Sequence, residues 1–169
     1  MDWERKRILD EWYQVHSDAI FKYICLISKD YQQAEDLTQE TFIKAYHHMD
    51  NFQKKAQVRT WLFRIAHNVT IDYLRKRKPL RVFEAIFHQQ VERKALPEEQ
   101  LIIQEEVREL YQALEKLKPA HREVIILRKI KGFSIKETST ILNWSENKVK
   151  ITLHRAMPVF KQALKSEEE

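Results

Sequence analysis

Hydrophobic residues recur every three or four positions along most of the chain, which is the spacing of one face of an α-helix. Within residues 5–29 the series is Ile8, Trp12, Val15, Ala19, Tyr23 and Leu26. Asp30 can cap a second helix, whose apolar side is Ala34, Leu37, Thr41, Phe42, Ala45, Tyr46 and Met49. Residues 50–58 are polar and interrupt the pattern, so we expect a loop there.

The next series predicts a long helix with Thr60 as its N-cap and Lys78 as its last residue, because Pro79 blocks continuation. One face of this helix is apolar and consists of Leu62, Ile65, Ala66, Val69 and Tyr73. Residues 79–104 contain two prolines and no sustained period, which predicts a linker. The apolar residues Phe83, Ile86 and Phe87 suggest that this linker forms one amphipathic turn or docks on a partner.

The last third of the chain has the outline of a helix-turn-helix. Its packing helix carries the stripe Val107, Leu110, Leu114 and Leu117. Pro119 suits a first helical turn, Gly132 a helix end, and Ser134 and Ser145 are N-caps on either side of a turn at Asn143. We therefore predict an all-α fold of two small helical domains, residues 1–78 and 105–169, joined by the linker 79–104.

Composition excludes several classes of function. A single glycine among 169 residues rules out the glycine-rich loops that bind phosphates and dinucleotides. The lone Cys25 cannot form an internal disulfide, and no apolar run is long enough to span a membrane, so we expect a soluble cytoplasmic protein. There is no metal-ligand cluster and no nucleophile–base arrangement, so we expect no cofactor, no metal and no enzymatic activity of the chain itself.

Charge is distributed in blocks. Residues 52–91 hold nine basic and two acidic side chains, and residues 116–166 hold twelve and three. The stretches 30–51 and 92–115 are acidic. Two basic surfaces on separate domains suggest a polyanion contacted at two places, although two solvated helical faces would give the same charge pattern.

The helix that follows Ser145 is the candidate DNA reader. Its inner face is Val149, Leu153, Ala156 and Phe160, and its outer face is Asn147, Lys148, Lys150, Ile151, His154 and Arg155. Cations suit phosphates, arginine suits guanine edges and an exposed isoleucine suits a thymine methyl group. We expect this helix to bind the DNA major groove, against the simpler alternative of a solvated basic face. Pro158 suggests that the helix kinks or ends near Met157.

The loop at 50–58 and the outer face of the helix after it suit single-stranded DNA. Such sites combine cations, aromatic rings and amides. The candidate residues are Phe52, Lys54, Lys55, Trp61, Arg64, Asn68, Arg75, Lys76 and Arg77. For Trp61 we favour a place in the core over a stacking role.

The helix at 34–49 is the candidate protein-docking element. Its outer face combines Ile43 with Asp36, Gln39, Glu40 and His47. An exposed isoleucine among acidic and amide groups suggests a docking patch, because DNA phosphates would be repelled there. A Glu-rich outer helix with one stray isoleucine is the alternative.

Taken together, these elements resemble the bacterial RNA polymerase sigma factors, specifically the short extracytoplasmic-function branch. The resemblance rests on AEDLTQETFIKAY at 34–46, RTWLFRIAHN at 59–68, and the region from LEKLKPAHREVIILRKIKGFS at 114–134 to KVKITLHRA at 148–156. The chain departs from the family at three places: Asn143 stands where a turn glycine is common, Lys136–Glu137 where an acidic pair is frequent, and Pro158 where a residue that is often helical is found. The absence of a long acidic N-terminal region and of a middle domain favours the short branch.

The resemblance implies a role for each region. Asp36, Leu37, Gln39, Glu40, Phe42 and Ile43 would dock on the β′ subunit of core polymerase. The loop at 50–58, with Asn68, would capture a flipped base of the -10 promoter element. Lys150, Ile151, His154 and Arg155 would read the -35 element. The implied partners are core polymerase (β′ and β), promoter DNA and a membrane-associated anti-sigma factor.

Two other functions remain open from the sequence. One is a free-standing helix-turn-helix repressor or activator, and the other is a helical interaction scaffold whose basic faces are incidental. Neither of these functions requires both the exposed Ile43 patch and the polar face that contains Asn68.

Overall fold

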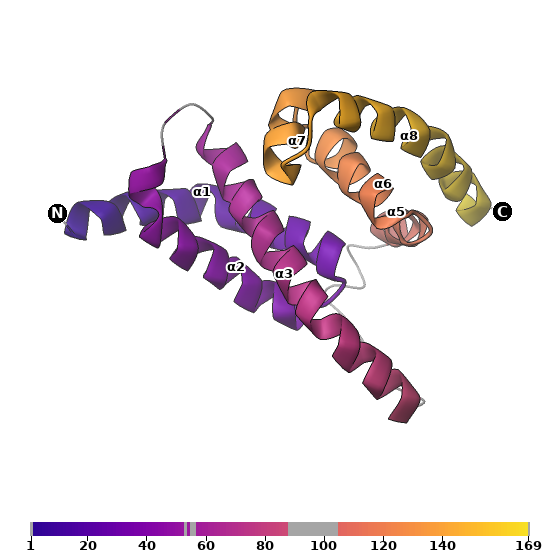
Figure 1. Cartoon of the computed structure of the whole chain (residues 1–169), viewed down its shortest axis with the longest axis horizontal. Helices are drawn as coiled ribbons and strands as arrows, with labels where there is room; N and C mark the ends of the chain where they lie inside the picture. Colours follow the sequence, from indigo (N-terminus) through magenta and orange to yellow (C-terminus); the bar gives the residue numbers. More distant parts are fainter. Residues whose placement is uncertain (1, 53, 55–56, 88–104, 169) are drawn as a thin grey trace. The chain divides into compact units, whose positions relative to one another are not determined.

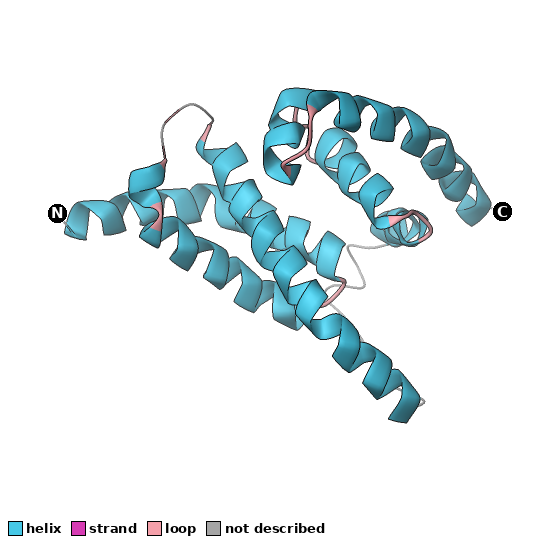
Figure 2. Cartoon of the chain, in the orientation of Figure 1, coloured by secondary structure: helices cyan, strands magenta, loops and turns pink. Residues whose placement is uncertain are grey.

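The structure, a computed structural model, describes residues 2–52, 54, 57–87 and 105–168. These residues form helices joined by short turns, and no strand occurs among them (Figure 2). The predicted all-α class is confirmed. The chain divides into two compact units, Met1–Lys94 and Ala95–Glu169, which we call the N-terminal and C-terminal units.

The N-terminal unit is built from α1 (Asp2–Ser28), α2 (Tyr31–His47), the short 3-10 helix η1 (Met49–Asn51) and α3 (Val58–Phe87) (Figure 1). The three long helices pack pairwise against one another. Their shared core is fully buried and includes Ile20, Tyr23, Ile24, Leu62, Phe63 and Ala66. Asp30 caps α2 as predicted, accepting a hydrogen bond from the backbone of Gln33.

Helix α3 differs from its prediction at both ends. It begins at Val58, and Thr60 is a buried residue inside its first turn instead of the N-cap. It also continues past Pro79 to Phe87, so the predicted end at Lys78 is wrong. A proline removes only one main-chain donor and disturbs only the turn before it, so a helix can resume after it. The residues 88–104 of the predicted linker lie outside the described residues, and docking by Phe83, Ile86 or Phe87 stays a prediction.

The C-terminal unit consists of α5 (Glu105–Glu115), α6 (Pro119–Ile125), the π-helical turn η2 (Ile126–Ile130), α7 (Ile135–Leu142) and α8 (Glu146–Glu168). Helix α8 packs on α5, α6 and α7. The core between them contains the buried side chains Leu114, Ile125, Leu127, Phe133, Ile141, Val149 and Ala156.

The turn signals in this unit are confirmed. Ser134 and Glu137 form a reciprocal capping box at the start of α7. Gly132 and Asn143 both have positive φ, 75° and 57°, which these two residue types tolerate best. Helix α8 runs through Pro158 to Glu168, so the end suspected near Met157 does not occur.

The helix predicted to end at Gly132 contains a wider turn. In η2 the backbone N–H of Lys131 bonds to the carbonyl of Ile126, five residues back, at 2.8 Å. The N–H of Phe133 then bonds to the carbonyl of Leu127 at 2.9 Å. These bonds satisfy carbonyls at the helix end and direct Phe133 into the core, ahead of α7.

Candidate polymerase and nucleic-acid interfaces

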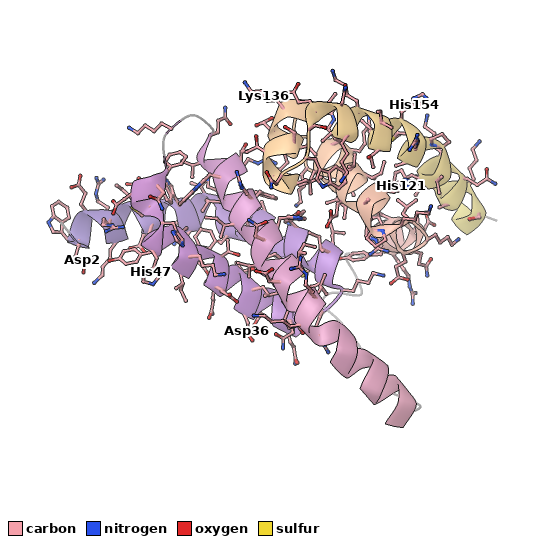
Figure 3. The ribbon with its side chains drawn as sticks, in the orientation of Figure 1. Asp2, Asp36, His47, His121, Lys136 and His154 are labelled. Atoms are coloured by element: carbon pink, nitrogen blue, oxygen red, sulfur yellow. The ribbon has the colours of Figure 1, made fainter. Side chains whose placement is uncertain are left out.

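The outer face of α2 is an exposed patch with one large apolar side chain at its centre. Asp36, Gln39 and Glu40 are exposed, and Ile43 keeps 57% of its surface accessible. Asp36 and His47 can be followed on this helix in Figure 3. The spacing of three, four and seven residues places the four side chains on one side of the helix. We call Asp36, Gln39, Glu40 and Ile43 the α2 patch.

Leu37 and Phe42, assigned to docking by the family resemblance, have a different environment. They are 3% and 4% exposed and belong to the core of the N-terminal unit. The ring of Phe42 meets that of Tyr13 edge-on, with centroids 5.0 Å apart. The contact of Phe42 with Tyr13 holds α2 against α1, so these two residues belong to the fold beneath the patch.

Three aromatic rings meet at the base of the loop between η1 and α3. Phe52 lies 5.2 Å from Trp61 and 5.9 Å from Trp12, and the two tryptophans are 5.7 Å apart, measured between ring centroids. All three side chains are half-buried. Trp61 therefore belongs neither to the deep core nor to an open stacking surface. Lys54 is exposed and adopts a left-handed backbone, while Lys55 lies outside the described residues.

The outer face of α3 carries the predicted cations and amide, with one exception. Arg64, Asn68, Arg75 and Lys76 are exposed. Arg77 is instead drawn back into the unit, where NH1 lies 2.6 Å from the carboxylate of Asp30 and also donates to the hydroxyl of Tyr73. The cationic run is thus split, with Arg77 engaged in holding helices together.

Behind this face lies a buried polar pair. The hydroxyl of Tyr23 and Nδ1 of His67 are 3.2 Å apart, and His67 is only 8% exposed. Burial lowers the pKa of His67 to about 4, because a charged imidazole would lose its hydration there. This pair could not be predicted from the sequence, since a histidine next to Asn68 lies close to the polar face by helical spacing alone.

In the C-terminal unit, α8 exposes all six predicted DNA-facing side chains: Asn147, Lys148, Lys150, Ile151, His154 and Arg155. Ile151 keeps 51% of its surface accessible. Ser145 caps the helix by accepting from the backbone of Lys148 at 3.1 Å. The ammonium of Lys148 lies 4.2 Å from the ring centroid of Trp144, which holds this lysine close to the helix-turn-helix turn.

A groove of about 580 Å³ extends the basic surface beyond the predicted set. It has Ile135, Leu153, Met157 and Pro158 in its walls, together with the cations and histidine Lys129, Lys150, His154 and Lys161. Lys129 was not predicted because it lies in η2, away from the reading helix in sequence, and Lys161 because the helix was expected to kink or end near Met157. Figure 3 marks His154 on α8.

Two neighbouring charged residues of α6 interact with different parts of this unit. Arg122 donates from Nε to the carbonyl of Leu114 at 2.9 Å and from NH2 to that of Leu117 at 3.1 Å, which closes the end of α5. Burial raises the pKa of Glu123 to about 7, against the opposing charges of Arg122 and Lys148. A carboxylate therefore lies behind the first turn of the candidate reading helix.

Within the described part of the chain, no helix has the length and apolarity that a membrane crossing requires.

Two sequence families match the two units. Residues 12–79 match Sigma-70 region 2, and residues 107–157 match Sigma-70, region 4. Among curated proteins, the ECF RNA polymerase sigma factor SigX of Bacillus subtilis is 36% identical over 89% of this chain and 80% of its own length. The RNA polymerase sigma factor YlaC of the same organism is 33% identical over 95% of both chains.

Solved structures give the same picture. The sigma factor RpoE of Bartonella quintana, in complex with the anti-sigma factor NepR, aligns with a TM-score of 0.74 at 25% identity, over 92% of this chain and 96% of that one. CnrH, in complex with the cytosolic domain of CnrY, aligns with a TM-score of 0.71 at 25% identity, over 95% and 90% of the two chains.

Proposed function

This chain belongs to the ECF family of RNA polymerase sigma factors. We propose which of its surfaces binds polymerase and which bind promoter DNA. A sigma factor binds core RNA polymerase and promoter DNA and directs promoter-specific initiation of transcription. Bond formation in RNA belongs to the polymerase, so the chain itself acts as a specificity subunit without a cofactor. Its place of action is the cytoplasm, where the bacterial chromosome lies.

The α2 patch is the proposed docking site for the β′ subunit. Ile43 supplies an apolar anchor, and Asp36 and Glu40 supply negative charge around it. Interfaces place apolar side chains at the centre and use charge to orient the partner. Phosphates would be repelled by the same carboxylates, which favours a protein partner over DNA.

The loop that follows η1 and the outer face of α3 form the proposed -10 site. Asn68 offers an amide that can read the edge of an unpaired base, and Arg64, Arg75 and Lys76 offer cations for the strand backbone. Lys54 and Lys55 would add charge from the loop. Arg77 is bonded to Asp30 and Tyr73, so we assign it to the fold of this site and not to DNA binding.

The outer face of α8 is the proposed -35 site in duplex DNA. Helix α8 follows α7 across a short turn, and the second helix of such a motif is the one that enters the major groove. Arg155, Lys150 and His154 supply donors for bases and phosphates, and Ile151 an apolar contact. Contacts of this unit with the β subunit are also part of the proposal.

An anti-sigma factor is the proposed regulator. The relatives RpoE and CnrH were solved in complex with NepR and with the cytosolic domain of CnrY. A partner that covers the α2 patch would prevent docking on polymerase. We propose such a partner for this chain, anchored at the membrane.

The observation that carries the proposal is the separation of charge between helices. The one strongly exposed apolar residue of α2 stands among carboxylates, whereas the cations proposed to bind DNA lie on α3 and α8 and in the loop before α3. A protein that must hold polymerase and DNA at once needs two such surfaces of opposite sign.

The test is the affinity of the chain for bacterial core polymerase after charge reversal. Asp36→Lys with Glu40→Lys is expected to weaken binding by about tenfold or more, because it replaces attraction between opposite charges across the interface with repulsion between like charges. Glu4→Lys with Asp10→Lys is the matched control, because it changes the net charge equally on exposed positions of α1. Equal affinities for the two double variants would contradict the docking assignment.

A further inference from the structure

Helix α1 reaches the base of the proposed -10 loop at two points. Arg5 contacts the chain just before the loop, and Trp12 contacts the loop itself. The two residues are seven positions apart, which is close to two turns, so they lie on the same side of α1. Nothing in the family resemblance assigned a role in DNA recognition to either residue.

The first contact is made by the guanidinium of Arg5. Its NH2 donates to the carbonyl of Tyr46 at 3.1 Å and lies 3.3 Å from the carboxylate of Asp50. The same guanidinium lies 5.3 Å from the centroid of the Tyr46 ring. Asp50 belongs to η1, so this contact fixes the chain where it leaves α2.

The second contact is made by the indole of Trp12. It meets Phe52 at 5.9 Å and Trp61 at 5.7 Å, both nearly edge-on with interplanar angles of 77° and 70°. Phe52 is the first residue after η1, and Trp61 lies in the first turn of α3. Trp12 therefore touches both sides of the loop with one ring system.

Without the contacts that Trp12 makes, Phe52 and Trp61 would be held only through their own elements and their contact with each other, and fixing them on DNA would cost entropy. Contacts that hold both residues lower this cost before the DNA arrives. Because all three rings are half-buried, part of the cluster lies at the surface. Trp61 belongs to α3, the helix that also carries the exposed Asn68.

We infer that Trp12 and Arg5 are positioning residues for -10 recognition, acting by fixing the base of the loop between η1 and α3. This inference rests on the proposed function, because it assumes that the loop reads the -10 element. It adds α1 to the recognition apparatus of this chain. Neither residue is required to touch DNA.

The test compares runoff transcription by core polymerase and full-length variants on promoters with a matched or a scrambled -10 element. The measured quantity is the ratio of the two activities, with core affinity determined in parallel. Trp12→Ala is expected to lower the ratio about tenfold, since it removes both ring pairs. Trp12→Phe keeps an aromatic ring and is expected to restore most of the ratio.

Trp3→Ala is the matched control. Trp3 lies on the same helix and is 69% exposed, so the same substitution there removes an indole without touching the loop. It is expected to leave the ratio unchanged. A merely structural role of Trp12 would lower core affinity and both activities together, and the ratio would stay constant.

Arg5→Gln gives an independent measurement in case Trp12→Ala does not fold. It removes the ion pair with Asp50 and is expected to lower the ratio about threefold with unchanged core affinity. An unchanged ratio for both Arg5→Gln and a folded Trp12 variant would overturn the inference. If the wild-type chain itself fails to distinguish the two promoters, the proposed function fails instead.

Discussion

Asp30 and Arg77, forty-seven positions apart in the sequence, form an ion pair of 2.6 Å between Oδ2 and NH1. The other carboxylate oxygen of Asp30 caps α2 by accepting from the backbone of Gln33 at 3.2 Å. One side chain thus starts α2 and fastens α3 to it. The hydrogen bond with Asp30 raises the pKa of Arg77 above its ordinary value.

Replacement of Arg77 is expected to affect stability more than DNA binding. Arg77→Ala removes a partly buried, charge-assisted hydrogen bond and should lower the free energy of unfolding of the N-terminal unit by about 1–2 kcal/mol. Arg75→Ala, at an exposed position of the same turn, should change it by less than about 0.5 kcal/mol. Urea unfolding of the two variants measures this, and equal losses would contradict the assignment.

The stability of the N-terminal unit is expected to rise with pH between about pH 4 and pH 6.5. The pKa of His67 is lowered to about 4 in the folded state from 6.5, so the unfolded chain binds more protons in this window. Across this window the contribution of His67 to the free energy of unfolding changes by about 3 kcal/mol. It is fully present above pH 6.5 and lost as the pH falls towards 4.

The measurement is the difference between wild type and His67→Gln in unfolding free energy, taken at several pH values. Carboxylates that titrate in acid affect both proteins equally, so the difference isolates His67. The difference should shrink as the pH falls. A difference that stays constant with pH would show that His67 does not titrate as its burial indicates.

The C-terminal unit should show the opposite dependence on pH. The pKa of Glu123 is raised to about 7 in the folded state from 4.5, so the folded chain binds more protons between these values. Stability from this group is therefore lost as the pH rises through 7, by up to about 3 kcal/mol. Glu123→Gln should remove this loss. The indole NMR resonance of Trp144, which lies in this unit, reports its unfolding in both proteins. Parallel pH profiles for the two proteins would contradict the raised pKa.

Arg155 and Lys150 are expected to differ in what they contribute to -35 recognition. Arg155→Ala should lower the preference of the holoenzyme for a matched over a scrambled -35 element, at a cost of about 1–3 kcal/mol. Lys150→Ala should weaken binding to both promoters alike and reduce the dependence of binding on salt. Competition binding at two salt concentrations separates the two effects. An unchanged preference in Arg155→Ala would remove that residue from base reading.

The elements that local chemistry determines were predictable from the sequence. Asp30, Ser134 and Asn143 each act through neighbours within a few residues, and each has the predicted role at a helix end. The exposed faces of α2 and α8 follow from helical periodicity, which places Ile43 and Ile151 outside by spacing alone.

The elements that depend on long-range contacts were not predictable in this way. Arg77 looks like one of four equivalent cations until Asp30 is placed beside it. Trp12 looks like a core residue of α1, and its contacts with Phe52 and Trp61 arise only when α1 and α3 are packed. Pro79 predicts a helix end, but its penalty is local and α3 continues through it to Phe87.

Promoter-specific initiation by this chain can be tested by runoff transcription with purified bacterial core polymerase across a pool of candidate promoters, with and without the protein. We predict transcripts that depend on the protein and share a -10 and a -35 element at fixed spacing. We also predict that Asp36→Lys with Glu40→Lys lowers their yield at limiting protein concentration. An absence of transcripts together with an absence of binding to core polymerase would contradict the assignment as a sigma factor.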